Sequence, residues 1–382
     1  MFVKTRTIKK GEDHMLMKKG KFDYWTFLIV LVLVGIGLVM VLSSSQYFTQ
    51  YEPYNDSFYY LKRQAVNVAV GFVAMYFATK INYRIYRKFA WPALVLGIGL
   101  MLLVMLSGLG DSAKGSERWI DLGFVRFQPS DVMKICLVLF LATKLSNRKT
   151  RMKSFFREFG PYLLLVAGVC GLVAVNDLGT AIVMAGTVFF MFIAAGVPGK
   201  YLGTLVGAGC GLVAVAIVVE PYRMRRLTGF IDPWEDPLGV GYQTIQSLLA
   251  IGSGGFMGVG LGAGGAKWFY LPEQHTDFIF SVLVEELGFL GGAFLILLFL
   301  LFTWRGITIA LKSEDRFASL LALGITMMIT VQALVNIGIA LGMLPVTGIT
   351  LPFISYGGTS VVVSLAAVGV LLNISRFAKM NA

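Results

Sequence analysis

Charged side chains are scarce in this sequence. They make up 14% of the 382 residues, whereas hydrophobic residues make up 57%. Several uninterrupted apolar runs reach the roughly 20 residues that an α-helix needs to cross a hydrocarbon core of about 30 Å. The sequence therefore excludes a water-soluble globular protein and predicts an all-α, polytopic membrane protein.

Cysteine and histidine are also rare, with three and two residues respectively. Cys136, Cys170 and Cys210 lie inside apolar segments without the spacing of a metal site, so we interpret them as small core residues rather than disulfide partners. His275 has no second histidine nearby with which to form a metal or catalytic pair. The first apolar run, residues 27–42, lacks an A-x-A cleavage site and is long for a signal peptide, which predicts a retained helix.

Nucleotide-binding signatures are weak or missing. Gly260, Gly262 and Gly265 spell G-x-G-x-x-G, but the strand and helix of a βαβ unit do not surround them. Lys267 does not belong to a Walker A sequence, because alanine precedes it and tryptophan follows it. We therefore expect these glycines to provide backbone flexibility or close approach to a ligand or a neighbouring helix.

Ten apolar segments are predicted to cross the membrane. Their approximate ranges are 22–44, 64–79, 91–107, 131–145, 162–175, 179–195, 201–219, 277–303, 318–341 and 359–375. A long loop, residues 220–276, separates the seventh helix from the eighth. A basic tail over residues 1–21 and a short tail over residues 377–382 flank a membrane domain that spans residues 22–376.

Basic residues are distributed unequally between the two sides of this predicted bundle. With the N-terminus in the cytoplasm, 23 of the 33 Lys and Arg residues fall in inner segments and 10 in outer ones, which satisfies the positive-inside rule. Both termini are then cytoplasmic, whereas the long loop and four polar residues lie outside: Arg118, Lys134, Asp177 and Asp277. The net charge of +12 therefore indicates contact with anionic membrane lipid rather than with nucleic acid. Because cytoplasmic ATP is absent from the outer side, a reaction there needs a substrate that carries its own leaving group.

Asp277 lies where the long loop becomes an apolar helix. Ionisable groups at such a boundary are functional candidates, although Asp is also a favourable residue for capping the start of a helix. Both roles remain open on position alone. Glu285 and Glu286 lie further along the same helix and point away from Asp277, so we expect them to fix helix packing or to face another chain.

The segment before the fourth helix carries a basic and aromatic cluster. Lys114, Arg118 and Trp119 would suit a phosphate or pyrophosphate headgroup, which arginine binds in bidentate fashion. The alternative is an interfacial anchor, because Trp and Arg favour the headgroup level of a bilayer.

The fourth helix opens with Gln128, Ser130 and Asp131, and Lys134 follows one turn later. Asp131 and Lys134 can pair at i, i+3, so this group either caps the helix or holds an anion. Asp177 lies in the tight turn between the fifth and sixth helices, where Asp is a common turn residue.

Two other helices carry packing signals. Gly203, Gly207 and Gly211 make two G-x-x-x-G steps, which predict a close-packing seam. Gln332 and Asn336 lie one turn apart and are expected to form hydrogen bonds between helices.

Six segments taken together resemble the SEDS family (shape, elongation, division and sporulation) of bacterial cell-wall proteins, the FtsW and RodA type. They occur in the family's order: KGSERWIDLGFVRFQPSDVMK, NDLGTA, FIDPWEDPLGVGYQTIQSLLAIGSGG, GVGLG, LPEQHTDFIFSVLVEELGFLGG and LPVTGITLPFISYGGTS. The family usually has Glu where Asp131 stands and Pro where Asn176 stands. The first departure shortens a carboxylate without changing its charge, and it weakens the transfer of a role to Asp131.

The resemblance implies a peptidoglycan glycosyltransferase that polymerises lipid II, a polyprenyl-pyrophosphate-linked glycan, into β-1,4-linked strands at the outer face of the cytoplasmic membrane. It implies a class B penicillin-binding protein, a transpeptidase, as partner, and Asp277 as general base. The expected substrate-binding residues are Lys114, Arg118, Trp119, Gln128, Ser130, Asp131, Lys134, Asp177, Lys267, Ser355 and Tyr356. A divalent cation, Mg²⁺ or Mn²⁺, is a candidate cofactor that would neutralise the charge of the departing pyrophosphate. No organic cofactor is expected.

Two other functions are open for the same architecture. A lipid II flippase would favour polar groups near the bilayer midplane and an internal repeat, and the sequence displays no such repeat. A silent scaffold that only recruits the transpeptidase is the second alternative.

Overall fold

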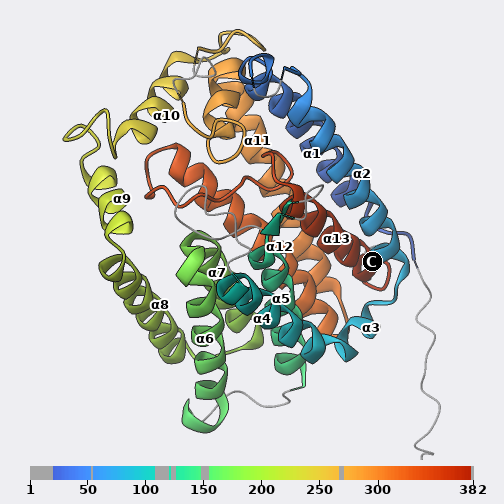
Figure 1. The fold of residues 1–382 in the computed structure, drawn as a ribbon. Helices are drawn as coiled ribbons and strands as arrows, with labels where there is room; N and C mark the ends of the chain where they lie inside the picture. The colour runs from blue at the N-terminus through green and yellow to red at the C-terminus, as the bar shows by residue number, and fades with distance from the viewer. Residues whose placement is uncertain are drawn as a thin grey trace, which may run out of the picture.

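The computed structural model describes residues 20–52, 55–107, 120–121, 126–147, 155–265 and 271–379. Within these residues the protein is a helical bundle (Figure 1). Its helices are α1 (Tyr24–Ser45), α2 (Tyr59–Lys80), α3 (Tyr83–Lys88), α4 (Ala90–Ser107), α5 (Pro129–Ser146), α6 (Gly160–Asn176), α7 (Leu178–Ala195), α8 (Gly199–Val219), α9 (Pro221–Ile231), α10 (Tyr242–Ser253), α11 (Ile279–Lys312), α12 (Arg316–Ala340) and α13 (Gly358–Ser375). Short 3₁₀ and π turns cover Phe48–Gln50 and Phe155–Phe159. The extended pairing in the described chain is a two-residue antiparallel ladder between β1 (Ile120–Asp121) and β2 (Arg126–Phe127).

The predicted all-α membrane fold is confirmed, and each of the ten predicted segments lies on a helix of the structure. Seven helices in the described chain are long and apolar enough to cross a membrane: α1, α6 with its preceding π turn, α7, α8, α11, α12 and α13. The apolar part of α4 is shorter, and α5 carries Asp131, Lys134 and Lys144. The protein is thus a multi-pass membrane protein, and the count of ten crossings stays a prediction.

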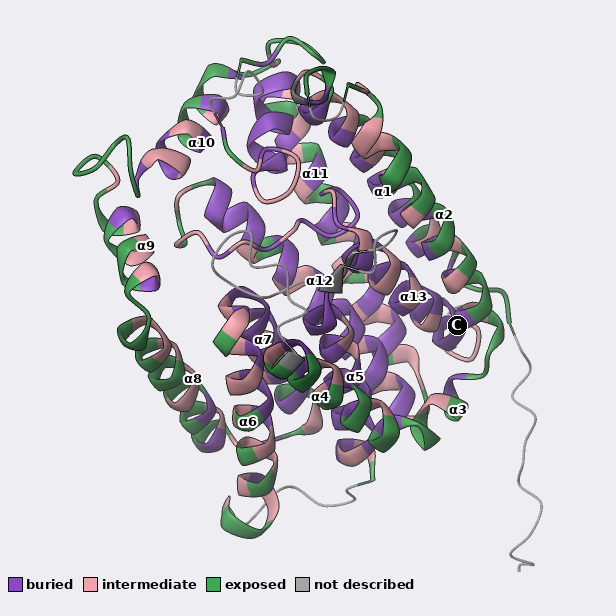
Figure 2. Cartoon of the chain, in the orientation of Figure 1, coloured by how far each residue is buried: buried purple, intermediate pink, exposed green. Residues whose placement is uncertain are grey.

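Helices α12 and α13 form the centre of the bundle. Figure 2 shows both as largely buried, whereas α8 at the periphery is mostly exposed or intermediate. Helix α13 packs against α2 at short range, because a Cβ at Gly369 would lie 2.5 Å from the carbonyl oxygen of Met75. Helix α12 packs against α5, α7 and α11. Residues that α5 and α12 direct at each other are therefore held in a rigid core.

The predicted glycine seam of α8 is wrong within the described part of this chain. A Cβ added at Gly203, Gly207 or Gly211 would meet no atom within 4 Å. Only Tyr201 and Leu205 of α8 are buried. The glycines follow the G-x-x-x-G spacing, but they do not face a neighbouring helix of this chain.

The ends of the described chain lie side by side. The backbone N–H of Gly20 donates to the carbonyl oxygen of Arg376 at 2.9 Å. Both termini therefore leave the bundle at the same end, which agrees with the prediction that they share one side of the membrane. The cytoplasmic identity of that side stays a prediction.

The segment predicted as a long loop contains two helices, α9 and α10, at the opposite end of the bundle (Figure 1). The buried Arg223 of α9 donates to the carbonyl oxygens of Ala174 and Val175 at 2.9 and 2.6 Å. Carbonyls in the last turn of a helix have no intrahelical partner. Arg223 therefore supplies donors to the end of α6 and fastens the loop to the bundle.

Helix α11 is interrupted at Gly288, where φ is 71° and ψ is −171°. The glycine-rich segment 254–260 fills this break: Val259 and Gly260 donate N–H groups to the carbonyl oxygens of Glu285 and Glu286, each at 3.0 Å. A Cβ at Gly258 would lie 2.2 Å from the Glu286 carbonyl oxygen. Irregular backbone in a membrane protein requires such internal partners. The expected close approach of this glycine-rich loop to a helix is confirmed.

Candidate active site around Asp277

Asp277 is half-buried in the turn that leads into α11. The N-cap position of α11 is Phe278, without a side-chain capping bond, and the helix begins at Ile279. The helix thus begins two residues later than predicted, and Asp277 is not its N-cap residue. The capping alternative for Asp277 therefore loses its basis.

The backbone around Asp277 is fixed from other parts of the chain. The carbonyl oxygen of His275 accepts from the N–H of Tyr356 at 2.9 Å. The carbonyl oxygen of Thr276 accepts from the hydroxyl of Ser355, and that of Asp277 accepts from the amide of Asn336 at 2.8 Å. Three consecutive carbonyls are thus held, so the position of the Asp277 side chain is set by α12 and by residues 355–356.

Ser355 was predicted to contact substrate, but its side chain is buried and serves the fold. Its hydroxyl oxygen also accepts from the N–H of Leu351 at 2.8 Å. Gln64 of α2, which sequence reasoning missed, donates to the carbonyl oxygen of Ser355 at 3.0 Å. The available signal for Gln64 was an amide side chain in a helix whose following residues are largely apolar. A direct contact between Ser355 and substrate stays a prediction.

An aromatic group borders the same turn. The Tyr60 ring lies 4.5 Å from the His275 ring and 4.7 Å from the Tyr356 ring, measured between centroids. All three side chains are half-buried. Tyr356, a predicted substrate-binding residue, thus borders the turn that contains His275 and Asp277, together with Tyr60, which was not predicted as a site residue. Contact between Tyr356 and substrate stays a prediction.

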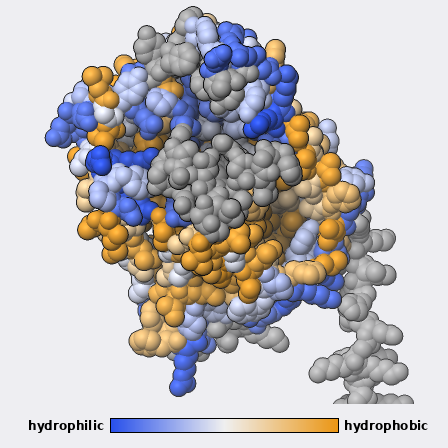
Figure 3. All heavy atoms as spheres, in the orientation of Figure 1, coloured by the Kyte–Doolittle hydropathy of each residue, from blue (hydrophilic) through white to orange (hydrophobic). Residues whose placement is uncertain are grey.

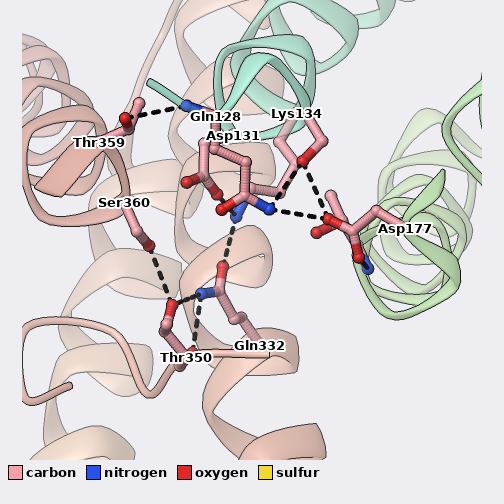
Figure 4. Close-up of polar contacts among 10 residues, drawn as sticks. Gln128, Asp131, Lys134, Asp177, Gln332, Thr350, Thr359 and Ser360 are labelled. Carbon is pink, nitrogen blue, oxygen red and sulfur yellow. Dashed lines mark hydrogen bonds and ion pairs between the residues drawn. The ribbon is translucent and has the colours of Figure 1, made fainter. Parts of the chain in front are cut away.

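A buried polar cluster connects α5, α7 and α12 (Figure 4). The Lys134 ammonium lies 2.8 Å from a carboxylate oxygen of Asp131 and donates to the side-chain oxygen of Gln332 at 2.6 Å. The predicted i, i+3 pair of Asp131 and Lys134 is confirmed. Both side chains are only 5% exposed, so this is an ion pair inside the bundle.

Asp177 joins this cluster from the turn before α7. One of its carboxylate oxygens caps α7 by accepting from the N–H of Thr180 at 3.1 Å. The other accepts from the Gln128 amide and the Ser130 hydroxyl, each at 2.9 Å. The ordinary turn role of Asp177 is confirmed, and its association with the start of α5 was not predicted. Contact between Asp177 and substrate stays a prediction.

The other ends of the cluster reach the segment before α13 and the first turn of α13. Gln332 donates to the carbonyl oxygen of Thr350 at 2.9 Å, and the backbone N–H of Gln128 donates to the Thr359 hydroxyl at 3.1 Å. The Thr350 hydroxyl donates to Ser360 at 3.3 Å. Sequence reasoning missed the three hydroxyl residues, although all belong to the LPVTGITLPFISYGGTS segment.

Asp131 keeps one carboxylate oxygen, Oδ2, buried without a hydrogen-bond partner. Among the described residues, however, no group of three or more His, Cys, Asp or Glu side chains could hold a metal ion. The described residues therefore do not form a closed metal site of their own. Four predicted binding residues, Lys114, Arg118, Trp119 and Lys267, lie outside the described residues.

Glu285 and Glu286 serve helix packing, as expected. The Ser43 hydroxyl of α1 lies 2.6 and 2.7 Å from the two carboxylate oxygens of Glu286. Glu285 accepts from the backbone N–H of Gly265 at 2.7 Å. Glu286 thus links α11 to α1, and Glu285 links α11 to the glycine-rich loop.

Figure 3 shows apolar residues gathered below a more hydrophilic upper end, to which α9 and α10 belong in Figure 1. Asp277 follows those helices in the chain and directly precedes α11. The site therefore combines a half-buried carboxylate at the start of a membrane helix with a buried ion pair. Such a carboxylate can accept a proton from a substrate hydroxyl that approaches from the hydrophilic end.

Comparisons with known proteins identify relatives over nearly the whole chain. Stage V sporulation protein E of Bacillus subtilis (strain 168) is 43% identical over 96% of this chain and 100% of its own length. A probable peptidoglycan glycosyltransferase FtsW of Geobacter sp. (strain M18) is 42% identical over 93% of this chain and 96% of its own length.

Solved structures share the fold. A chain of a peptidoglycan synthase complex that coordinates polymerization and crosslinking has a TM-score of 0.77 and 32% identity, covering 94% of this chain and 99% of that one. The rod shape determining protein RodA of Thermus thermophilus has a TM-score of 0.70 and 29% identity, covering 94% of this chain and 98% of its own. The family model for FtsW, RodA and SpoVE, described as a cell cycle protein, matches residues 24–380. The chain therefore belongs to the FtsW/RodA/SpoVE family of cell cycle proteins.

Proposed function

We propose that this protein is a peptidoglycan glycosyltransferase that polymerises lipid II into β-1,4-linked glycan at the outer face of the cytoplasmic membrane. The observation that carries this function is the turn at Asp277, whose backbone is fixed by three carbonyl hydrogen bonds from distant residues. Relatives that match nearly all of the chain are named probable peptidoglycan glycosyltransferases, which supports the same reaction here.

In the proposed reaction Asp277 is the general base. It accepts the proton of an acceptor sugar hydroxyl while that oxygen attacks the anomeric carbon of the donor. The bond from this carbon to the pyrophosphate oxygen breaks, and its electron pair leaves with the lipid pyrophosphate. A single displacement on an α-linked donor inverts the configuration and gives the β-linked product.

The negative charge of the departing pyrophosphate requires cations. We assign this role to Arg118 and Lys134, because cations that are aimed at developing charge stabilise the transition state. Lys134 is paired with Asp131 and Gln332 in the structure, so a phosphate would take the place of one of these acceptors. Divalent cations commonly bind through one or two carboxylates together with substrate phosphates. A Mg²⁺ or Mn²⁺ ion would therefore enter with the pyrophosphate.

A class B penicillin-binding protein is the proposed partner, because it would crosslink the strands that this chain makes. The similarity to a chain of a peptidoglycan synthase complex supports such an assembly. We also propose that both termini are cytoplasmic. They leave the same end of the bundle, and the positive-inside rule assigns 23 of the 33 Lys and Arg residues to that side.

Purified full-length protein, supplied with lipid II and a divalent cation, tests this function. Gel separation of labelled glycan should reveal new chains with the protein alone or with its transpeptidase partner present. Transfer of lipid II across vesicle membranes without polymer would identify a flippase instead. Absence of both activities, with the folded complex verified, would identify a scaffold and contradict the proposal.

A further inference from the structure

Asn336 of α12 is a fully buried amide whose donor group is fully used and whose acceptor atom is not. Its Nδ2 group donates to the carbonyl oxygen of Asp277 at 2.8 Å and to that of Ile349 at 2.6 Å. Its Oδ1 atom is buried without a hydrogen-bond partner. An unsatisfied buried acceptor reduces stability. The amide therefore satisfies two backbone carbonyls while its own acceptor stays unpaired, and one of those carbonyls belongs to Asp277.

The same face of α12 carries Gln332, one turn before Asn336. Gln332 accepts from the Lys134 ammonium at 2.6 Å and donates to the carbonyl oxygen of Thr350 at 2.9 Å. The two amides thus hold the consecutive carbonyls of Ile349 and Thr350. Residues i and i+4 of an α-helix are separated by about 6 Å along the axis. The rigid helix thereby connects the turn at Asp277 to the buried ion pair of Lys134.

We propose that Asn336 is a positioning residue that holds Asp277 in register with the Lys134–Asp131 ion pair. This inference rests on the proposed function of Asp277 as general base. Tyr356 and Ser355 hold the two preceding carbonyls, of His275 and Thr276, whereas Asn336 holds the carbonyl of Asp277 itself. In this proposal Asn336 does not touch the substrate. It holds the backbone of Asp277 and thereby orients the Asp277 carboxylate.

Two substitutions test this role. Asn336→Ala removes both hydrogen bonds, and Asn336→Leu removes them while it retains the side-chain volume and eliminates the unpaired acceptor. Both variants leave the carbonyl oxygens of Asp277 and Ile349 without this donor, so kcat is measured per folded protein, with folding checked by thermal melting. We expect both variants to reduce kcat for lipid II polymerisation by about 10- to 100-fold, because misplacing a catalytic group by about 1 Å has an effect of this size. KM should change by less than about threefold, as the binding groups remain.

Asn373 of α13 provides a matched control at the opposite end of the bundle. It is also fully buried, accepts from the N–H of Tyr83 at 2.9 Å and donates to the carbonyl oxygen of Thr79 at 2.7 Å. Asn373→Ala therefore removes two hydrogen bonds of the same kind without touching the site. We expect it to lower the melting temperature while kcat per folded protein stays at the wild-type value.

Hydrogen–deuterium exchange measures the positioning without relying on catalysis. The N–H groups of Thr276, Asp277 and Phe278 all donate to the carbonyl oxygen of Glu273. Exchange in a peptide that spans residues 271–281 should accelerate in Asn336→Ala and Asn336→Leu and stay unchanged in Asn373→Ala. A kcat within about twofold of wild type in folded Asn336→Leu would overturn the inference.

The same experiments separate this inference from the proposed function. If Asp277→Asn polymerises lipid II normally, the general-base assignment fails and the inference that rests on it fails with it. If Asp277→Asn is inactive while Asn336→Ala and Asn336→Leu are fully active, only the positioning role of Asn336 is overturned. Equal losses of kcat in Asn336→Leu and Asn373→Ala would show a general stability effect and would likewise overturn it.

Discussion

Lys134 and Asp131 form an ion pair of 2.8 Å between side chains that are each 5% exposed. Such a pair gains little net stability from its charges, because desolvation offsets their attraction. Breaking it has a much larger effect, since one buried charge is then left without a partner. Single and double substitutions of this pair can therefore distinguish its effect on protein stability from its effect on activity.

Replacing Lys134 alone should destabilise the protein strongly. We expect Lys134→Met to lower the free energy of unfolding by about 3–5 kcal/mol. The double variant Lys134→Met with Asp131→Leu should recover most of this stability and remain inactive, if Lys134 contributes to binding the pyrophosphate. Thermal melting and lipid II polymerisation, measured on the same preparations, test both parts. Full activity in the double variant would contradict the role assigned to Lys134.

The break in α11 gives a second prediction. Gly258 has φ of 81°, and a Cβ there would lie 2.2 Å from the carbonyl oxygen of Glu286. Gly258→Ala should therefore lower stability by about 1–3 kcal/mol, the range for strained backbone. Gly252→Ala is the control, because Gly252 lies in α10 and its Cβ would meet no atom within 4 Å. Equal melting temperatures for the two variants would contradict this interpretation of the loop.

Asp23, at the start of α1, gives a prediction on acid stability. Burial raises the pKa of its carboxyl, but hydrogen bonds from Arg305 and Thr26 outweigh burial and hold the pKa below its usual range. A lowered folded-state pKa contributes stability above the unfolded pKa of about 3.9, and this stability is lost as the pH falls below that value.

Arg305→Gln removes the largest of these favourable interactions. Burial then dominates, so the pKa of Asp23 should rise and its carboxylate should no longer stabilise the fold above the unfolded pKa of about 3.9. The variant should therefore be less stable than the wild type near neutral pH, and this difference should shrink as the pH falls. Melting temperatures measured between about pH 3 and pH 7 test this shift. Parallel pH profiles for the two proteins would contradict the assigned role of Arg305.

Cysteine labelling tests the orientation of the bundle. Leu238, in the connection between α9 and α10, is 88% exposed, so Leu238→Cys should react with a membrane-impermeant reagent from outside the cell. Lys88→Cys in α3 should react only after the inner face is opened. Both belong in a Cys210→Ala background, because Cys210 is exposed in the structure. Labelling of Leu238→Cys only from the inside would reverse the proposed orientation.

The sequence was sufficient to predict the helices, because long apolar runs and charge placement are local properties. It did not predict the break at Gly288. Glu285 and Glu286 interrupt the apolar pattern just before Gly288, but the break itself depends on backbone donors from Val259 and Gly260. It also did not predict α9 and α10, because α9 is rich in arginine and α10 has only 12 residues, so neither resembles a membrane crossing.

In the site, too, local contacts were predicted from the sequence and contacts between distant residues were not. The pairing of Asp131 with Lys134 follows from their spacing on one helix and was predicted. Asn336 was recognised as a hydrogen-bonding residue, but its partner at Asp277 is 59 positions away, and no spacing rule relates them. Ser355 was assigned to the substrate through the family resemblance. Its hydroxyl partners at Thr276 and Leu351 arise only when the chain folds, so the sequence did not reveal its structural role.

The rate of lipid II polymerisation by Asp277→Asn is the most direct measurement of the central claim. The substitution preserves the shape of the side chain and removes its ability to accept a proton. A general base contributes about 10²- to 10⁴-fold to a reaction rate, so we predict a loss of that size with unchanged melting temperature and membrane insertion. Polymerisation by Asp277→Asn at the wild-type rate would contradict the account.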